Sequence, residues 1–273
     1  MLIAPAAPLA FEDFPRVLGY LHSLGIKTFY PVLPYADITV WAYYTMLKAN
    51  PRAKLISSAC VGMNLYLERD TKYAGYLCSV FSPLLCTARY LKTYRRLETS
   101  FAFLSPCLLK KNEFAVKNEF AVKNQEYLVR YNITIGDLKK WLAAEDIDTR
   151  QFEPCFEETG QNGKGLTLAA FGGIGKTLTA LLPDTGYHVE QGLDNAASYL
   201  SNSREFRESH SRAFIFEPYA CRGGCARGSG VGADTVCERA DFLKCGEKTD
   251  IAGIFKLFSY YDATLRLEDF CHR

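Results

Sequence analysis

The sequence has no apolar run long enough to cross a membrane and no excess of charge of either sign. Its 273 residues carry 32 lysines and arginines against 30 aspartates and glutamates, which gives a formal net charge of +2. Dedicated nucleic-acid binders and polybasic membrane binders need a larger positive balance, so we expect neither activity. A membrane-spanning helix needs about 18 consecutive apolar residues, and we therefore expect no membrane insertion.

The first ten residues also lack the basic residues that open a secretory signal peptide. They are apolar, and Glu12 and Asp13 follow directly, so we expect a cytoplasmic protein. Ten cysteines are many for such a chain. In a reducing compartment cysteines serve as ligands, reactive thiols or core residues more often than as disulfides.

Helix and strand patterns alternate along the first part of the chain. Apolar residues at helical spacing predict a helix over residues 14–24 and a second one over 37–50. Aromatic and β-branched residues predict strands over 27–33 and 55–58. This alternation indicates an α/β fold with mainly parallel strands, in which ligands bind at the carboxyl ends of strands.

The later segments repeat these patterns with less regularity. Residues 111–124 contain the unit Lys-Asn-Glu-Phe-Ala-Val twice, which we interpret as a duplication that lengthens a surface connection. Beyond Gly232 the signals weaken, and we expect His272 to fray because it is next to last. The remaining predicted elements are helices that begin at Pro83 and Thr134, a helix over 193–200, and strands over 100–105, 127–131, 187–190 and 213–216.

Two cysteines follow predicted strands directly. Cys60 comes after the strand 55–58, where a helix begins, and Cys107 comes after the strand 100–105. A thiolate at the start of a helix meets backbone N–H groups and the positive end of the helix dipole. The alternative for Cys60 is a buried core cysteine, and the residues alone leave both interpretations open.

A third cysteine segment is rich in glycine. Cys221 and Cys225 are separated by three residues, two of them glycine, and more glycines follow up to Gly232. Thiolates are soft ligands for iron–sulfur clusters, zinc and copper, and glycine lets the backbone approach a multi-atom group closely. The alternative is a glycine-rich turn with two incidental cysteines. Together with the two strand-end thiols, however, the pair makes four thiolates, the complement of a 4Fe-4S cluster.

Other candidate residues have plainer explanations. Lys110 could aim its ammonium at the anionic ligands of such a cluster, but an exposed basic pair with Lys111 is the more usual explanation. We expect Cys86 to pack in the core and Cys155 not to be a ligand. The widely spaced Cys237, Cys245 and Cys271 give little support for a zinc site.

Residues 172–177, Gly-Gly-Ile-Gly-Lys-Thr, resemble the end of a phosphate-binding loop. The full pattern needs a glycine six positions before Lys176, and that position is Ala170. A nucleotide-binding protein is therefore a less favoured alternative, and we expect a glycine turn here.

Taken together, the three cysteine segments resemble the cluster-binding domain of the iron-only (FeFe) hydrogenases and their sensor-like and hydrogenase-like relatives. The segments read Ile-Ser-Ser-Ala-Cys-Val-Gly around Cys60, Phe-Leu-Ser-Pro-Cys-Leu-Leu-Lys around Cys107, and Ala-Cys-Arg-Gly-Gly-Cys-Ala-Arg-Gly around Cys221. The resemblance covers about residues 15–232. It implies two α/β lobes with short, mainly parallel sheets and a cluster at their interface, preceded by an N-terminal segment over 1–14 and followed by a C-terminal extension over 233–273.

The resemblance also implies cofactors, roles and partners. The cysteines Cys60, Cys107, Cys221 and Cys225 would hold a 4Fe-4S cluster. Cys225 would bridge this cluster to a di-iron unit with CO and CN ligands (the H-cluster), and Lys110 would hydrogen-bond a cyanide. Such a site interconverts H2 with protons and electrons. Electrons would come from a ferredoxin-like partner or subunit, and hydrogenase maturation factors would insert the di-iron unit.

Several positions depart from the family pattern. Ala59 stands where active members carry a proton-relay cysteine, and residues 39–45 lack the carboxylates that continue the relay. Ser105 replaces a methionine, Gly62 follows Val61 where Pro-Gly is expected, and no ferredoxin-type CxxCxxCxxxC segment is present. We therefore expect a slow hydrogenase or a hydrogen or redox sensor. The alternative is a non-catalytic 4Fe-4S electron-transfer or assembly-factor-like protein.

Overall fold

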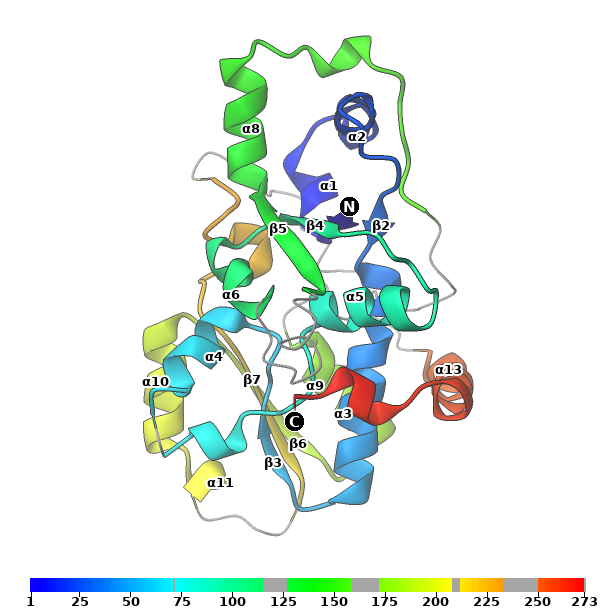
Figure 1. Cartoon of the computed structure of the whole chain (residues 1–273). Helices are drawn as coiled ribbons and strands as arrows, with labels where there is room; N and C mark the ends of the chain where they lie inside the picture. The colour runs from blue at the N-terminus through cyan, green and yellow to red at the C-terminus, as the bar shows by residue number, and fades with distance from the viewer. Residues whose placement is uncertain (71, 115–126, 159–171, 208–211, 233–249, 273) are drawn as a thin grey trace.

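The computed structural model describes residues 1–70, 72–114, 127–158, 172–207, 212–232 and 250–272. Within these residues two parallel β-sheets lie one above the other in Figure 1, each with helices packed on it. One sheet has four strands in the order β2-β1-β4-β5, and the other has three in the order β3-β7-β6. The predicted α/β fold with short parallel sheets is confirmed.

The four-stranded sheet has the N-terminus of the chain near its centre. Strand β1 pairs in parallel with β2 on one side and with β4 on the other. The sequence patterns did not reveal this two-residue strand. The strands are β1 (Leu2–Ile3), β2 (Tyr30–Pro31), β4 (Phe101–Ser105) and β5 (Val129–Thr134).

Helices cover one face of this sheet through a continuous apolar cluster. Ile3 and Leu104, which point from β1 and β4, pack in this cluster with Val17 and Leu21 of α2 and with Leu138 of α8. Thr134 caps α8, which begins where the sequence predicted, and Asp13 caps α2. The helices are α1 (Ala7–Ala10), α2 (Phe14–Ser23) and α8 (Ile135–Ala144).

The three-stranded sheet separates two further groups of helices. Phe214 and Phe216 of β7 pack toward α4 and α10, whereas Ile215 packs toward α3 and α9. The strands are β3 (Lys54–Ile56), β6 (Gly186–Gln191) and β7 (Phe214–Tyr219). The helices are α3 (Asp37–Ala49), α4 (Val61–Leu67), α9 (Gly173–Leu181), α10 (Leu193–Asn202) and α11 (Arg204–Arg207).

The C-terminal residues return to the body of the molecule. Helix α13 (Ile251–Thr264) packs against α3, and the Trp41 Nε1–H donates to Asp262 Oδ1 at 2.7 Å. The short helix η7 (Leu267–Phe270) follows and lies against α3 and α5 (Pro83–Thr93), as the red segment of Figure 1 shows. The sequence patterns did not reveal α13, although its buried apolar residues recur at helical spacing.

Some sequence-based details are wrong. The strand expected over 27–33 is limited to β2, because the one-turn helix η1 (Leu33–Tyr35) begins directly after it. Trp141 lies three residues after the buried Leu138 on α8, a spacing typical of one inner face, yet it is 52 % exposed. The remaining short elements are η2 (Ala74–Tyr76), η3 (Leu108–Lys110), α6 (Lys111–Phe114), η4 (Thr149–Gln151) and η6 (Cys225–Arg227).

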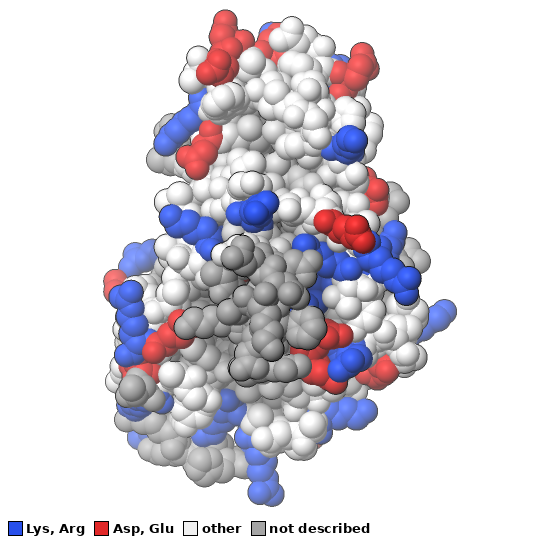
Figure 2. Space-filling view, in the orientation of Figure 1, with Lys and Arg blue, Asp and Glu red and all other residues white. Residues whose placement is uncertain are grey.

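The surface and the helices agree with the low net charge and the absence of long apolar runs. Figure 2 shows basic and acidic side chains together on the visible face rather than a field of one sign. Among the described residues, no helix combines the length and apolar character needed to span a bilayer.

Candidate cysteine-lined site

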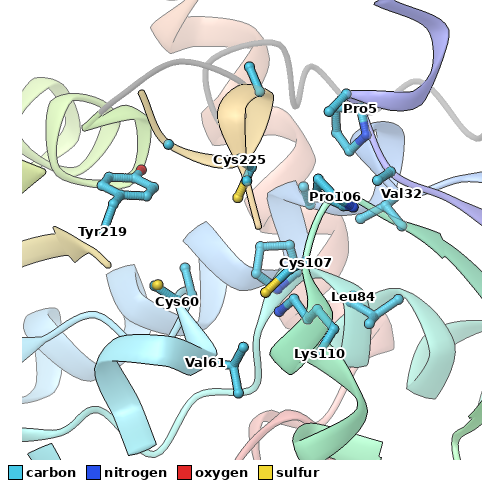
Figure 3. Close-up of a pocket in the computed structure, with 18 of the residues that line it drawn as sticks. Pro5, Val32, Cys60, Val61, Leu84, Pro106, Cys107, Lys110, Tyr219 and Cys225 are labelled. Atoms are coloured by element: carbon cyan, nitrogen blue, oxygen red, sulfur yellow. The ribbon is translucent and has the colours of Figure 1, made fainter. Parts of the chain in front are cut away.

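Strands of both sheets end at one cavity. Cys60 follows β3, Cys107 follows β4, and Cys221 and Cys225 follow β7. All four cysteines line the same cavity of about 150 Å³, together with Lys110. Figure 3 shows Cys60, Cys107, Cys225 and Lys110 around it. One water molecule needs roughly 10–15 Å³ of such space, so the cavity has space for a group of several atoms. The structure thus brings together all five residues that the sequence singled out.

The loop with Cys225 docks directly on the loop with Cys107. The Gly230 N–H donates to the Pro106 carbonyl at 2.8 Å, and the Leu108 N–H donates to Ser229 Oγ at 3.2 Å. A Cβ atom on Gly228 would lie 2.3 Å from the Pro106 carbonyl oxygen. Glycine is therefore required here, because any larger residue would push apart the two loops that carry cysteines.

The loop with Cys60 contacts the segment before Cys221. The Ala220 N–H donates to Cys60 Sγ at 3.4 Å. Between Cys221 and Cys225 the chain turns through Gly223 and Gly224, which have φ angles of +86° and +59°. Residues with a Cβ adopt such angles at a cost, so these glycines allow the two thiols to face one cavity.

The thiols lie within electrostatic reach of one another. The pKa of Cys225 is raised to about 12, chiefly by desolvation and also by the charges of Cys60, Cys107 and Cys221, whereas Lys110 lowers it. Burial also raises the pKa of Cys60, although N–H groups of neighbouring residues oppose this. The effect expected from a helix start is therefore outweighed at Cys60. Cys60 and Cys225, whose pKa values are raised, would become stable thiolates when a cationic centre binds them.

The donor set suits a cluster better than a single ion. Within the described part of the chain, no three or more His, Cys, Asp or Glu side chains gather closely enough to bind one metal ion. The four cysteines instead stand around the wall of a cavity. An iron–sulfur cube takes one thiolate at each of its four iron atoms, so its ligands lie apart. The residues present fit such a group.

Lys110 is not part of an exposed basic pair, and that interpretation is wrong. Its side chain is 12 % exposed, and its Nζ donates to both carboxylate oxygens of Glu113 at 2.7 and 2.8 Å. Ser82 Oγ donates to the same carboxylate at 2.8 Å. Burial lowers the pKa of Lys110, but the charge and hydrogen bonds of Glu113, together with the charges of Cys225 and Cys107, more than offset this, so the pKa is raised overall. The three-residue spacing from Lys110 to Glu113 was the one available signal for this partner.

The sequence patterns also missed Glu217 and Tyr219, which line the cavity from β7. Glu217 is 2 % exposed, and it accepts from the Gly175 N–H at 2.9 Å and from Tyr219 Oη–H at 2.5 Å. Burial raises the pKa of Glu217, and these hydrogen bonds oppose the rise.

The hydrogen bond from Gly175 to Glu217 also bears on residues 172–177, which resemble the end of a phosphate-binding loop. Gly172 has a φ of +69° and begins α9, as expected of a glycine turn. The N–H groups at the start of α9 that would cradle a phosphate instead bind the Glu217 carboxylate. A nucleotide would have to displace this buried carboxylate, which argues against nucleotide binding.

Beside Cys60, the side chain of Ala59 offers no group that can carry a proton. Ala59 lines the cavity, and its side chain is a methyl group. Behind it, the buried Tyr43 hydroxyl of α3 accepts from the Ser58 N–H at 2.7 Å. Ser105 is fully buried, and its Oγ accepts from the Cys107 N–H at 3.0 Å.

The other cysteines have different surroundings. Cys78 and Cys86 are buried, as expected for Cys86. The Cys155 N–H donates to the Pro15 carbonyl at 2.9 Å, and Cys271 pairs with Val80 in a β-bridge. Cys237, Cys245 and most of the duplicated segment lie outside the described residues.

Comparisons with known proteins agree on one family. Residues 1–229 match the family model described as "Iron only hydrogenase large subunit, C-terminal domain". A structure from a study of oxygen inactivation of FeFe-hydrogenase and degradation of its H cluster has a TM-score of 0.72 and 16% identity, over 100% of this chain and 92% of that one. An FeFe-hydrogenase variant from Chlamydomonas reinhardtii gives a TM-score of 0.72 and 16% identity, over 99% and 92%. No curated protein matches the chain.

Proposed function

Because the chain belongs to the family defined by the C-terminal domain of the iron-only hydrogenase large subunit, we propose that the four cysteines of the cavity hold a 4Fe-4S cluster. The observation that carries the proposal is their convergence, with Lys110, on one cavity at the carboxyl ends of both sheets. Iron–sulfur cofactors are typical of this family. Thiolate is the ligand that such clusters use.

The proposal extends to the di-iron unit of an H-cluster, which would occupy the same cavity beside the cysteines. Cys225 would bridge to this unit, and Lys110 would donate a hydrogen bond to one of its cyanides. When bound, the unit would supply the interconversion of H2 with protons and electrons. The protein's own contribution is then to orient the group through its thiolates, to hold the buried ammonium of Lys110 near it, and to line the rest of the cavity with apolar atoms.

Proton delivery decides between the possible activities. Ala59 cannot relay a proton, and residues 39–45 of α3 contain no carboxylate. A positioned acid or base accelerates such steps by about 10²–10⁴-fold, so its loss makes turnover slow. We therefore propose a slow hydrogenase or a hydrogen or redox sensor. A non-catalytic 4Fe-4S electron-transfer or assembly-factor-like protein is the second candidate. Ala59 and the lack of a carboxylate in residues 39–45 favour it as well.

Electron supply and maturation follow from the proposed cofactors. A ferredoxin-like partner or subunit would exchange electrons with the 4Fe-4S cluster, and maturation factors would insert the di-iron unit in the cytoplasm.

The test is metal content and infrared spectroscopy after anaerobic purification. We expect about four irons and four sulfides per chain, with further iron and bands of metal-bound CO and CN after maturation. The double variant Cys221→Ala/Cys225→Ala should lose the iron, whereas the control Cys155→Ala should keep it. About four irons without CO and CN bands would select the second candidate. A wild-type chain that binds no iron would overturn both candidates.

A further inference from the structure

The buried ion pair beside the cavity is anchored on a third side chain. Lys110 Nζ donates to Glu113 Oε1 at 2.7 Å and to Glu113 Oε2 at 2.8 Å, and Ser82 Oγ donates to the same Oε2 at 2.8 Å. Of these three residues, only Lys110 lines the cavity. Two hydrogen-bonded side chains therefore stand behind the one that faces a bound group.

The start of α5 holds Ser82 in place. Ser82 is 3 % exposed, and its hydroxyl accepts from the Leu85 N–H at 3.5 Å as the cap of this helix. The preceding Phe81 packs edge-on against the His272 ring with a centroid distance of 4.6 Å. The His272 N–H donates to the Ser79 carbonyl at 2.7 Å, so the expectation that this residue frays is wrong. Ser82 is thus held by its helix and by the C-terminal segment packed beside it.

The ion pair decides where the Lys110 ammonium stands. A lysine side chain is a point charge on a flexible four-carbon stem, so it needs a partner to keep it in one place. Figure 3 shows the Lys110 side chain directed toward the space between Cys60 and Cys107. An ammonium has three donors, and the Glu113 carboxylate offers two oxygens on one side of it, so at least one N–H remains for a group in the cavity.

The position of this charge matters for an iron–sulfur cofactor. The reduction potential of such a cluster depends on the charges and hydrogen bonds around it. The Coulomb energy of two charges falls with distance and is larger in a shielded site than in water. The side chains of Lys110 and Glu113 are only 12 % and 8 % exposed, so a small displacement of the ammonium changes its effect on a group in the cavity.

We propose that Ser82 and Glu113 are positioning residues for the bound cofactor. Ser82 holds the Glu113 carboxylate, and Glu113 holds the Lys110 ammonium at the cavity wall. There the charge of the ammonium favours an added electron, and its remaining N–H donates to an acceptor atom of the bound group. Ser82 and Glu113 do not touch that group and act through Lys110. The inference rests on the proposed function for the presence of the cofactor.

The positioning is tested first in the full chain without iron. Ammonium protons that are shielded from water exchange slowly, so NMR detects the signal of a buried lysine, and Lys110→Met assigns it. We expect a protected Lys110 signal in the wild type and proton exchange about tenfold faster or more in Ser82→Ala, because a hydrogen bond to a charged group is lost. Asp13→Ala removes the cap of α2, which does not line the cavity, and should leave the signal unchanged. A wild type without a protected Lys110 ammonium would overturn the proposal.

The effect on the cofactor is tested by redox titration of the iron-loaded protein. Ser82→Ala changes no charge but releases the Glu113 carboxylate, so the ammonium leaves the wall more often. We expect the midpoint potential to fall, with reduction about threefold less favourable or more. The same substitution should leave the potential unchanged in the Lys110→Met/Glu113→Gln background, which has no ion pair to position. Asp13→Ala should again match the wild type.

Glu113→Asp gives an independent test. It keeps the negative charge, but its side chain is a methylene shorter and cannot reach both Ser82 and Lys110 from the same backbone position. We expect its midpoint potential to fall as in Ser82→Ala, whereas an effect of the Glu113 charge alone predicts no change. Either variant decides the question if the other fails to load iron.

The outcomes separate this inference from the proposed function. A wild-type chain that binds no iron overturns the proposed function and, with it, the inference. An iron-loaded chain whose potential is the same in Ser82→Ala and Glu113→Asp as in the wild type overturns the positioning alone. A shift in Ser82→Ala that persists without the ion pair assigns Ser82 a structural role through α5 and also overturns the proposal.

Discussion

The cysteine wall of the cavity and the wall at Ala59 are built in different ways. The cysteine wall depends on the backbone, since each thiol follows a strand end and the loops dock through glycines such as Gly228. The wall at Ala59 lies on the loop that also carries Cys60, but its lack of a proton carrier depends on single side chains: the methyl group of Ala59 and residues 39–45 of α3, which contain no carboxylate. Such side chains can be exchanged one at a time without moving the backbone of the loops. A chain can therefore lose its proton relay and keep its cluster frame.

The largest effect on stability is expected where the cysteine wall holds a buried charge. Lys110→Met leaves the Glu113 carboxylate buried without its cation, and breaking such a pair costs about 3–5 kcal/mol. The double variant Lys110→Met/Glu113→Gln removes both charges and should recover most of this loss. Urea unfolding of the cluster-free proteins measures both values. The side-chain exposures of 12% and 8% indicate that the pair is shielded from water. Equal stability of the single and double variants would contradict this.

The docking of the two loops is the next most sensitive feature. Gly228→Ala places a Cβ 2.3 Å from the Pro106 carbonyl oxygen, so the loops must separate. Overpacking of this kind costs roughly 1–3 kcal/mol, and we expect iron loading to fall with it.

Gly75→Ala is the matched control for this change. A Cβ at Gly75 would meet nothing within 4 Å, so stability and iron content should stay close to the wild type. If Gly228→Ala loads iron as well as Gly75→Ala does, close docking of the two loops at Gly228 is not needed to hold the cysteines in place. The contrast drawn between the two walls would then be wrong.

The sequence predicted the repetitive parts of the fold and failed where structure depends on distant contacts. The helix over 37–50 and the strand over 187–190 have enough residues to show a period, and both are found nearly as predicted. Strand β1 has two residues, too few to show any period. Helix α13 has apolar residues at the right spacing, but its aromatic residues obscure the polar face, and Asp250 was not recognised as its cap.

At the site too, the sequence could not predict features that depend on contacts between distant residues. The spacing of the cysteine motifs, together with the family resemblance, singled out four thiols that do line one cavity. No pattern indicates that Lys110 is buried, because its burial depends on where Glu113 and Ser82 lie in the folded chain. Glu217 looks like an ordinary strand residue until the start of α9 is placed against it.

Glu217 gives a pH-dependent test of a third part of the cavity. Burial raises the pKa of its carboxyl group above the value in the unfolded chain, so its contribution to stability is fully present at low pH and is lost as pH rises through the folded-state pKa. Glu217→Gln does not titrate but must turn its amide N–H away from Gly175 and Tyr219, which costs about 1 kcal/mol. The free energy of unfolding of the variant should therefore rise relative to that of the wild type as pH increases from about 5 to about 8. A constant difference in unfolding free energy over this range would contradict the raised pKa.

The smallest effect is expected from restoring a relay group at the other wall. Ala59→Cys would place a thiol on the cavity surface, where a proton carrier can reach a bound group. We expect no onward transfer of the proton from this thiol into α3. The Ser58 N–H already donates to the Tyr43 hydroxyl, and residues 39–45 contain no carboxylate. A complete relay contributes about 10²–10⁴-fold, so the thiol alone should raise the turnover of the matured protein less than about tenfold. Hydrogen evolution with a chemical reductant measures this, with Cys155→Ala as the control for thiol content. A rise in turnover of about a hundredfold would mean that Tyr43 and Ser58 conduct protons. Ala59 would then be the one residue that interrupts the relay at this wall.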